Sequence, residues 1–254
     1  MDRQEILKSV VRSIFGAVPF GGTALNELFF EYNGQIKQKR LNRFVAILEE
    51  YFTEDSGINI DNIKTEDFND LFESVLRRVV QTKSELKLLR FKDILIRELN
   101  SPSENTELND HYLDLISSLT EEEITILYNH RHFTTEYEEK IDELNRHKDN
   151  LSSLKRQLDK EKDSNRTSEF QKPYDDLTET YERLNKQIDS VSKYRTAEFY
   201  GLSDNNFMFY KQRLFSKGLL IDDRMKRIGS LPFKDMGITE FGLEFIDFIK
   251  NSDE

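Results

Sequence analysis

The glycines within residues 16–23 are spaced almost as in a nucleotide-binding motif. Gly16, Gly21, Gly22 and Thr23 nearly reproduce the phosphate-binding loop, in which backbone N–H groups surround the phosphates. The lysine that reaches the terminal phosphates is missing, because Gly22 stands at its position. The apolar pattern before residue 16 is that of a helix, whereas the motif follows a strand. We therefore interpret these residues as a tight turn between two packed helices, and we expect no cofactor.

A second set of residues resembles the catalytic motifs of serine β-lactamases. Ser190 and Lys193 match the first motif, and Ser203, Asp204 and Asn205 match the second. The third motif is missing, and Ser190 falls at the end of a coiled coil instead of within an α/β domain. We interpret the match as coincidence, expect no catalytic residue, and predict that the chain is not an enzyme.

The histidines and carboxylates give no metal site by their spacing. His130 and His132 are two residues apart, so they diverge on a helix, and no third ligand has matched spacing. We interpret this pair as a polar helix end. The carboxylates of Glu121 to Glu123 and Glu136 to Glu143 have the pattern of solvated helix faces. The chain has no Cys, which excludes disulfides and thiolate ligands. We predict no metal.

The composition favours a mainly α fold. Apolar residues make up 37% of the 254 residues, below the roughly 45–50% of ordinary globular domains, and charged residues make up 33%. Long helices with solvated faces have this composition. Only 10 Gly and 4 Pro are present, which disfavours a sheet-rich fold with many tight turns. The length allows one large or two small domains.

Charge and hydropathy limit the partners and the compartment. The net charge is −11, and residues 101–194 hold most of the excess, with 13 basic and 22 acidic side chains. This distribution disfavours a large nucleic-acid footprint. No stretch approaches 18 uncharged apolar residues, and Met1 to Glu5 lack the pattern of a signal peptide. We expect a cytoplasmic protein without a transmembrane segment.

Residues 1–100 have the apolar periodicity of four amphipathic helices, which predicts a helical bundle. Ser and Thr are common at the N-terminal end of a helix, so we expect Thr65 and Ser84 to start the third and fourth helices. A polar stretch over residues 101–109 predicts a linker. The aromatic residues that we expect in the bundle core are Phe44, Phe68, Phe72 and Phe91.

Two features of this region could contact a membrane. Residues 13–25 are uncharged, apolar and too short to span a bilayer, so they could insert shallowly, although they also fit a packed helical turn. Two basic clusters could meet phosphate or anionic lipid, or form a solvated face paired with Glu and Asp. The clusters are Lys37, Lys39, Arg40 and Arg43, and Arg77, Arg78, Lys83, Lys87, Arg90, Lys92 and Arg97.

Residues 134–195 predict an antiparallel coiled-coil hairpin. Apolar residues alternate at spacings of three and four in two adjacent segments, with Lys148 at one position of the first seam. The polar residues 159–168 suit the tip, and Pro173 would lie in the first turn of the second arm. The seams are Tyr137, Ile141, Leu144, Leu151, Leu154 and Leu158, and then Phe170, Tyr174, Leu177, Tyr181, Leu184, Ile188 and Val191.

The C-terminal residues carry a resemblance to a known family. Tyr200 to Ser203 resemble the turn and cap that precede a recognition-type helix. Lys217 to Leu220 resemble the segment that leads from this helix into a wing. Ile238 to Phe245 have the form of a strand followed by a closing helix. Together they resemble the winged helix-turn-helix of MarR- and PadR-like regulators. The resemblance implies a small α+β module within residues 110–254, interrupted by the hairpin.

In that family the recognition helix enters the major groove and the wing touches phosphate. The resemblance thus implies nucleic-acid contacts by Asn205, Asn206, Lys211 and Arg213 on the helix and by Arg224, Lys226 and Arg227 on the wing. However, residues 195–254 carry nine basic and ten acidic side chains, which favours a protein partner or self-association over DNA. Aromatic residues also exceed the needs of one small core, so we expect one or two of them to be exposed. The candidate interface residues are Phe207, Tyr210 and Phe233.

These observations predict a non-enzymatic interaction protein in which a helical bundle and a winged-helix module are joined by a coiled-coil arm. The composition suggests an accessory protein of a prokaryotic regulatory or phage-defence system. A first alternative is a DNA-binding regulator that dimerises through the arm. A second alternative is a membrane-perturbing helical effector that acts through residues 13–25.

Overall fold

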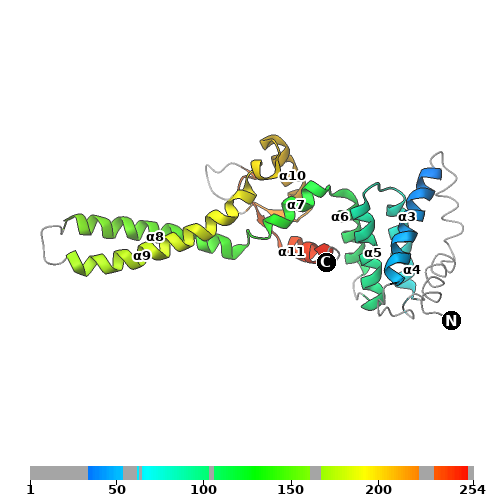
Figure 1. Cartoon of the computed structure of the whole chain (residues 1–254), viewed down its shortest axis with the longest axis horizontal. Coiled ribbons are helices and arrows are strands. Elements are labelled where there is room, and N and C mark those ends of the chain that lie inside the picture. The colour runs from blue at the N-terminus through cyan, green and yellow to red at the C-terminus, as the bar shows by residue number, and fades with distance from the viewer. Residues whose placement is uncertain are drawn as a thin grey trace. The chain divides into compact units, whose positions relative to one another are not determined.

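A computed structural model describes residues 34–53, 62, 65–102, 106–160, 167–222 and 232–250 of the chain. The described residues are mainly helical, with a small two-stranded antiparallel sheet near the C-terminus (Figure 1). The chain divides into two compact units. Unit 1 comprises Met1–Leu119 with Phe248–Glu254, and unit 2 comprises Thr120–Asp247.

Unit 1 is built from helices that bury one face each. The four predicted aromatic residues are all at most 2% exposed, which confirms them as core. Thr65 and Ser84 accept hydrogen bonds from the N–H groups of Phe68 and Lys87, so both are N-caps as expected. The described helices are α3 (Gly34–Thr53), α4 (Glu66–Val79), α5 (Glu85–Asn100) and α6 (Thr106–Ser118).

The boundary of unit 1 lies after Leu119, whereas the sequence predicts it near residue 100. α6 begins within the predicted linker and packs against α4 and α5. Its apolar side chains Leu113 and Ile116 are fully buried, which holds it in this unit. From the C-terminus, Phe248 accepts a hydrogen bond from Arg97 through its carbonyl oxygen at 2.7 Å and packs on the ring of Tyr112.

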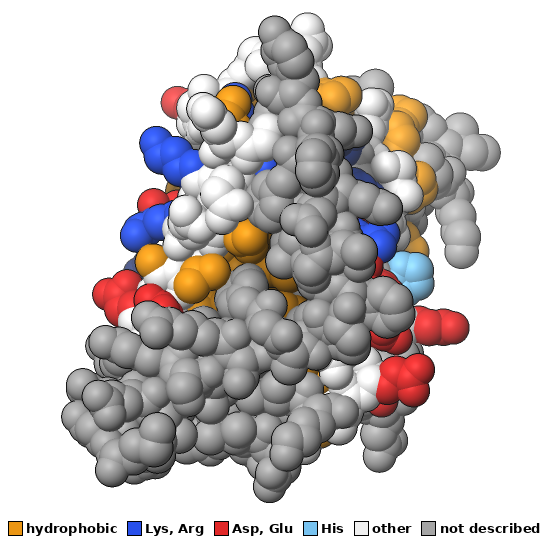
Figure 2. Space-filling view, turned by 90° about the vertical axis from the view of Figure 1, so that its right-hand side faces the viewer, with side chains coloured by type: hydrophobic (Ala, Val, Ile, Leu, Met, Phe, Trp, Pro, Cys, Tyr) orange, Lys and Arg blue, Asp and Glu red, His pale blue; other side chains and the backbone are white. Residues whose placement is uncertain are grey.

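Several basic side chains of unit 1 are held by neighbouring groups. Arg78 pairs with Asp114 at 2.5 Å, Arg40 donates to the Val80 carbonyl, and Arg43 pairs with Glu85. In the view of Figure 2, charged side chains of both signs lie around a group of hydrophobic ones. No described helix is both long enough and apolar enough to cross a bilayer. The candidate membrane segment, residues 13–25, lies outside the described residues.

Unit 2 contains the long hairpin and the small sheet. Thr120 starts its first helix with a capping box, because its hydroxyl accepts from the Glu123 N–H and the Glu123 carboxylate accepts from the Thr120 N–H. The elements are α7 (Glu121–His130), α8 (Thr135–Lys160), α9 (Thr167–Ser192), η2 (Lys193–Arg195), η3 (Glu198–Tyr200), α10 (Asp204–Ser216), β1 (Leu220–Ile221), β2 (Gly237–Ile238) and α11 (Glu240–Lys250), whose end belongs to unit 1.

α8 and α9 lie side by side over their lengths as a helical hairpin (Figure 1). Its seam differs from the predicted one in α8, where Lys148 is exposed and the preceding His147 is half-buried. The imidazole of His147 lies against the Glu143 carboxylate one turn earlier, with Nε2 3.2 Å from Oε1. α9 also begins earlier than expected, so Pro173 lies in its second turn instead of its first.

The sheet joins three backbone segments of unit 2. Leu220 of β1 pairs with Ile238 of β2, and the Ile238 N–H donates to the Phe133 carbonyl at 3.1 Å. The closing helix α11 fits closely against this sheet because residue 242 is glycine. A Cβ there would lie 2.4 Å from the Leu219 carbonyl oxygen, so Gly242 has no room for a side chain.

Candidate interaction site

α10 is the helix on which the resemblance puts the nucleic-acid contacts. Ser203 caps it by accepting a hydrogen bond from the Asn206 N–H, and Gly218 ends it with a positive φ of 72°. Asn205 and Asn206 are exposed in its first turn. The two asparagines are therefore accessible, as a contact surface requires.

Lys211 is buried, with 3% of its surface exposed. Its ammonium group donates to the Lys234 carbonyl at 3.1 Å and lies over the ring of Phe207. Burial lowers the pKa of Lys211 to about 8, with Arg195 lowering it further and Asp235 opposing. A side chain held in this way does not reach a nucleic acid, because its charge is directed into the protein.

Arg213 reaches α7 while part of its side chain stays exposed, and its guanidinium lies 5.8 Å from the centre of the Phe209 ring. Its Nε lies 3.1 Å from Oε1 of Glu123, a carboxylate with no exposed surface. The other oxygen of Glu123 accepts the Thr120 N–H at 2.8 Å. The pair joins two helices through residues that are 90 positions apart in sequence, and it balances a buried negative charge. α10 therefore has no Lys or Arg that is both exposed and unpaired.

The three predicted wing cations, Arg224, Lys226 and Arg227, lie outside the described residues. Asp222 and Phe233, which lie on either side of the segment that contains these cations, are described. Asp222 is buried, and its carboxylate accepts a hydrogen bond from the Phe233 N–H at 2.6 Å. Phe233 has a positive φ of 60°, which this hydrogen bond supports. Asp222 therefore joins the two described segments on either side of residues 223–231, and its carboxylate is directed into the protein.

The candidate interface aromatics fall into different environments. Phe207 is buried and stacks on Tyr200, so it belongs to the core of unit 2. Tyr210 is half-buried, and Phe233 is half-buried against Phe215 at 5.5 Å. The most exposed aromatic of α10 is Phe209, at 52%, which is not among the candidate interface residues named from the sequence. The expectation that one or two aromatic residues are exposed is confirmed.

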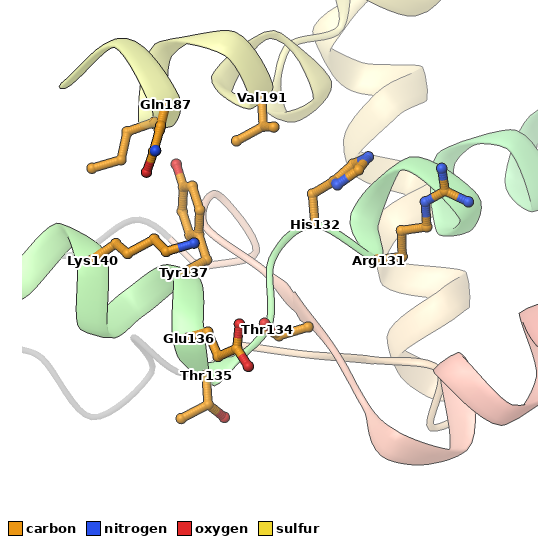
Figure 3. A pocket seen from close by; sticks show the side chains of 10 residues that line it. Arg131, His132, Thr134, Thr135, Glu136, Tyr137, Lys140, Gln187 and Val191 are labelled. Carbon is orange, nitrogen blue, oxygen red and sulfur yellow. The ribbon is translucent and has the colours of Figure 1, made fainter. Parts of the chain in front are cut away.

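A cavity of about 590 Å³ opens at the base of the hairpin. In Figure 3 the side chains of Tyr137 and Lys140 from α8 and of Gln187 and Val191 from α9 point toward the same space. Its volume lies within the roughly 300–1,000 Å³ of ligand sites. No described group of three or more His, Asp or Glu side chains could hold a metal ion. The lining is Arg131, His132, Thr134, Thr135, Glu136, Tyr137, Lys140, Gln187, Ile188 and Val191.

Arg195 organises the end of the hairpin and carries no sequence signal of its own. Its guanidinium donates to Glu138 at 3.2 Å and to the Met236 carbonyl at 3.1 Å. It also lies over the ring of Phe133 at 4.1 Å and near that of Tyr137 at 4.9 Å. One side chain thus ties the ends of both arms to the segment before β2.

The two histidines of the predicted polar helix end have different surroundings, and the prediction is wrong for His130. This residue has no exposed surface, and its Nδ1–H donates to the Ile126 carbonyl at 2.8 Å. Burial lowers the pKa of His130 to about 3, so it is neutral at pH 7. His132 stacks on the ring of Tyr194 at the edge of the cavity.

Comparisons of the chain with protein-family models, with curated proteins and with solved structures found no match.

Proposed function

We propose that this chain is a non-enzymatic interaction protein and that the outer face of α10 binds a protein partner. The observation that carries the proposal is an exposed aromatic side chain on a helix whose two cations are both engaged within the protein. Phe209 is 52% exposed beside exposed Asn205 and Gln212, while Lys211 and Arg213 are held by groups within the protein. Exposed aromatic residues are enriched in the cores of protein interfaces, and free cations supply DNA affinity.

The arrangement around α10 supports a winged-helix-like module as the carrier of this surface. α7 and α10 are joined by the Glu123–Arg213 pair, and the paired strands β1 and β2 receive a third backbone segment at Phe133. In a winged helix the helix before the wing presents the contact surface. The hairpin is then an insertion between Phe133 and the turn that precedes α10.

The experiment is a comparison of partner capture by three forms of the full chain in cells of the source organism. The Phe209→Asp variant should lose the partner that the wild type retains, because a charge cannot enter an apolar pocket without a large desolvation penalty. Gln212→Ala is the matched control, since it alters the same exposed face without removing the aromatic anchor. Equal capture by all three forms would exclude this face as the binding surface.

DNA binding is the second candidate, and the exposed asparagines Asn205 and Asn206 in the first turn of α10 favour it. Asn reads adenine in the major groove through a bidentate pair of hydrogen bonds. The test is a titration of the protein with random-sequence duplex at about 50 mM salt. We expect no binding tighter than about micromolar. Tighter binding with a steep salt dependence would replace the protein-contact proposal with this one.

A further inference from the structure

The hairpin of α8 and α9 leaves most of its apolar seam partly exposed. From Ile141 to Ile188, Leu184 is the one apolar side chain of the described seam that is buried, at 8% exposure. The other seam residues are half-buried, because two helices cover the contact line from one direction only. A second pair of helices laid along this line would complete a four-helix core.

The distal halves of the two arms, next to the hairpin tip, carry opposite charge. Residues 146–160 of α8 hold five basic and two acidic side chains, and residues 171–182 of α9 hold one basic and four acidic ones, so the net charges are +3 and −3. These side chains are exposed and available to a neighbour. They are Arg146, Lys148, Lys155, Arg156 and Lys160 on α8, and Asp175, Asp176, Glu179 and Glu182 on α9.

The proximal halves repeat the contrast with the signs exchanged. Residues 135–145 of α8 hold one basic and five acidic side chains, a net charge of −4. Residues 183–193, which are the end of α9 and the first residue of η2, hold three basic and one acidic side chain, a net charge of +2. Consider a second copy of the hairpin placed alongside the first, with both tips at the same end. If α8 of one copy lies against α9 of the other, opposite charges meet in both the distal and the proximal halves. Like charges meet when α8 faces α8.

We propose that two copies of the chain associate through this hairpin, with both tips at the same end and α8 of each copy against α9 of the other. This pairing repeats between chains the α8–α9 contact that already exists within each chain. It buries the open side of the seam, and it brings the opposite charges within the screening length of about 8 Å. The dimer uses the hairpin and not the outer face of α10, so it is independent of the proposed partner site.

The test is the mass of the full chain by sedimentation equilibrium, for the wild type and two charge variants. One variant replaces Asp175, Asp176, Glu179 and Glu182 with Lys, so that both distal halves are positive. The other replaces Lys148, Lys155, Arg156 and Lys160 with Glu, so that both are negative. We expect the wild type to have the mass of two chains and each variant that of one. A 1:1 mixture of the variants should return to the mass of two chains.

A control variant separates this pairing from an effect of total charge. It replaces Glu107, Glu198, Glu240 and Glu244, which are exposed and lie outside the hairpin, with Lys, and it should keep the mass of two chains. A wild type with the mass of one chain at about 50 µM would overturn the proposal. So would a mixture that stays at the mass of one chain, or a control variant that loses the dimer.

Discussion

At the scale of single residues, the ion pair between buried Glu123 and partly exposed Arg213 decides how α10 is used. Glu123 has no exposed surface and lies at the N-terminus of α7, where the helix dipole and the Thr120 N–H favour its charge. Arg213 supplies the remaining compensation from α10. A cation that compensates a buried carboxylate is not free to contact a phosphate group, so the pair turns this part of α10 into a structural contact.

Replacing Arg213 with Met should therefore destabilise unit 2 by about 3 kcal/mol, because it leaves a buried carboxylate without its partner. Chemical denaturation measures the change in unfolding free energy. Arg183→Met removes an exposed arginine from α9 and should cost at most about 0.5 kcal/mol. Adding Glu123→Gln to Arg213→Met should recover part of the loss. A cost below about 1 kcal/mol for Arg213→Met would contradict the role of the pair.

The buried imidazole of His130 gives a second residue-scale prediction. The folded protein protonates His130 only near pH 3, whereas the unfolded chain protonates it near pH 6.5. Lowering the pH below 6.5 therefore favours the unfolded state, and the stability is fully present only above that pH. Between pH 7 and pH 5 the loss from this group should be about 2 kcal/mol.

Denaturant midpoints at pH 7 and pH 5 test this dependence. His130→Leu should be less stable than the wild type at pH 7, and its stability should fall less between the two pH values, because the titrating group is gone. His111→Gln removes an exposed histidine and should keep the wild-type dependence. The same loss between pH 7 and pH 5 in His130→Leu as in the wild type would show that another group is responsible.

At the scale of elements, the hairpin depends on its seam. Leu184→Asp puts a carboxylate at the most buried seam position of α9, and we expect it to cost roughly 3 kcal/mol and to lower the helicity measured by circular dichroism. Lys186→Asp places the same side chain on the exposed face two residues away and should have little effect. If both variants melt like the wild type, the seam does not hold the arms together.

Sequence patterns predicted those features that depend on neighbours along the chain. The helix starts at Thr65 and Ser84 and the helical arms follow from spacings of three or four residues. The candidate site depends on contacts between distant segments, such as Arg195 with Met236, and no local pattern specifies such a contact. The burial of Lys211 was missed for the same reason, since its partner lies across the fold.

At the scale of the whole molecule, the chain divides into two compact units. Because unit 1 extends to Leu119, we predict that α6 is needed for its full stability. A fragment of residues 1–119 keeps α6, whose buried side chains Leu113 and Ile116 belong to the same core as Phe72. We expect this fragment to melt cooperatively and at a higher temperature than residues 1–100. Phe72→Ala within it should cost roughly 3–5 kcal/mol. Equal melting temperatures for the two fragments would place α6 outside the core.

The most direct measurement is site-specific photo-crosslinking from residue 209 of the full chain in cells of the source organism. A photoreactive phenylalanine analogue there keeps the aromatic character of the exposed anchor Phe209. We predict adducts with one protein partner, and none when the same analogue replaces the exposed Glu244 of α11. Adducts with nucleic acid at residue 209, or no adducts there, would contradict the proposal that the outer face of α10 binds a protein.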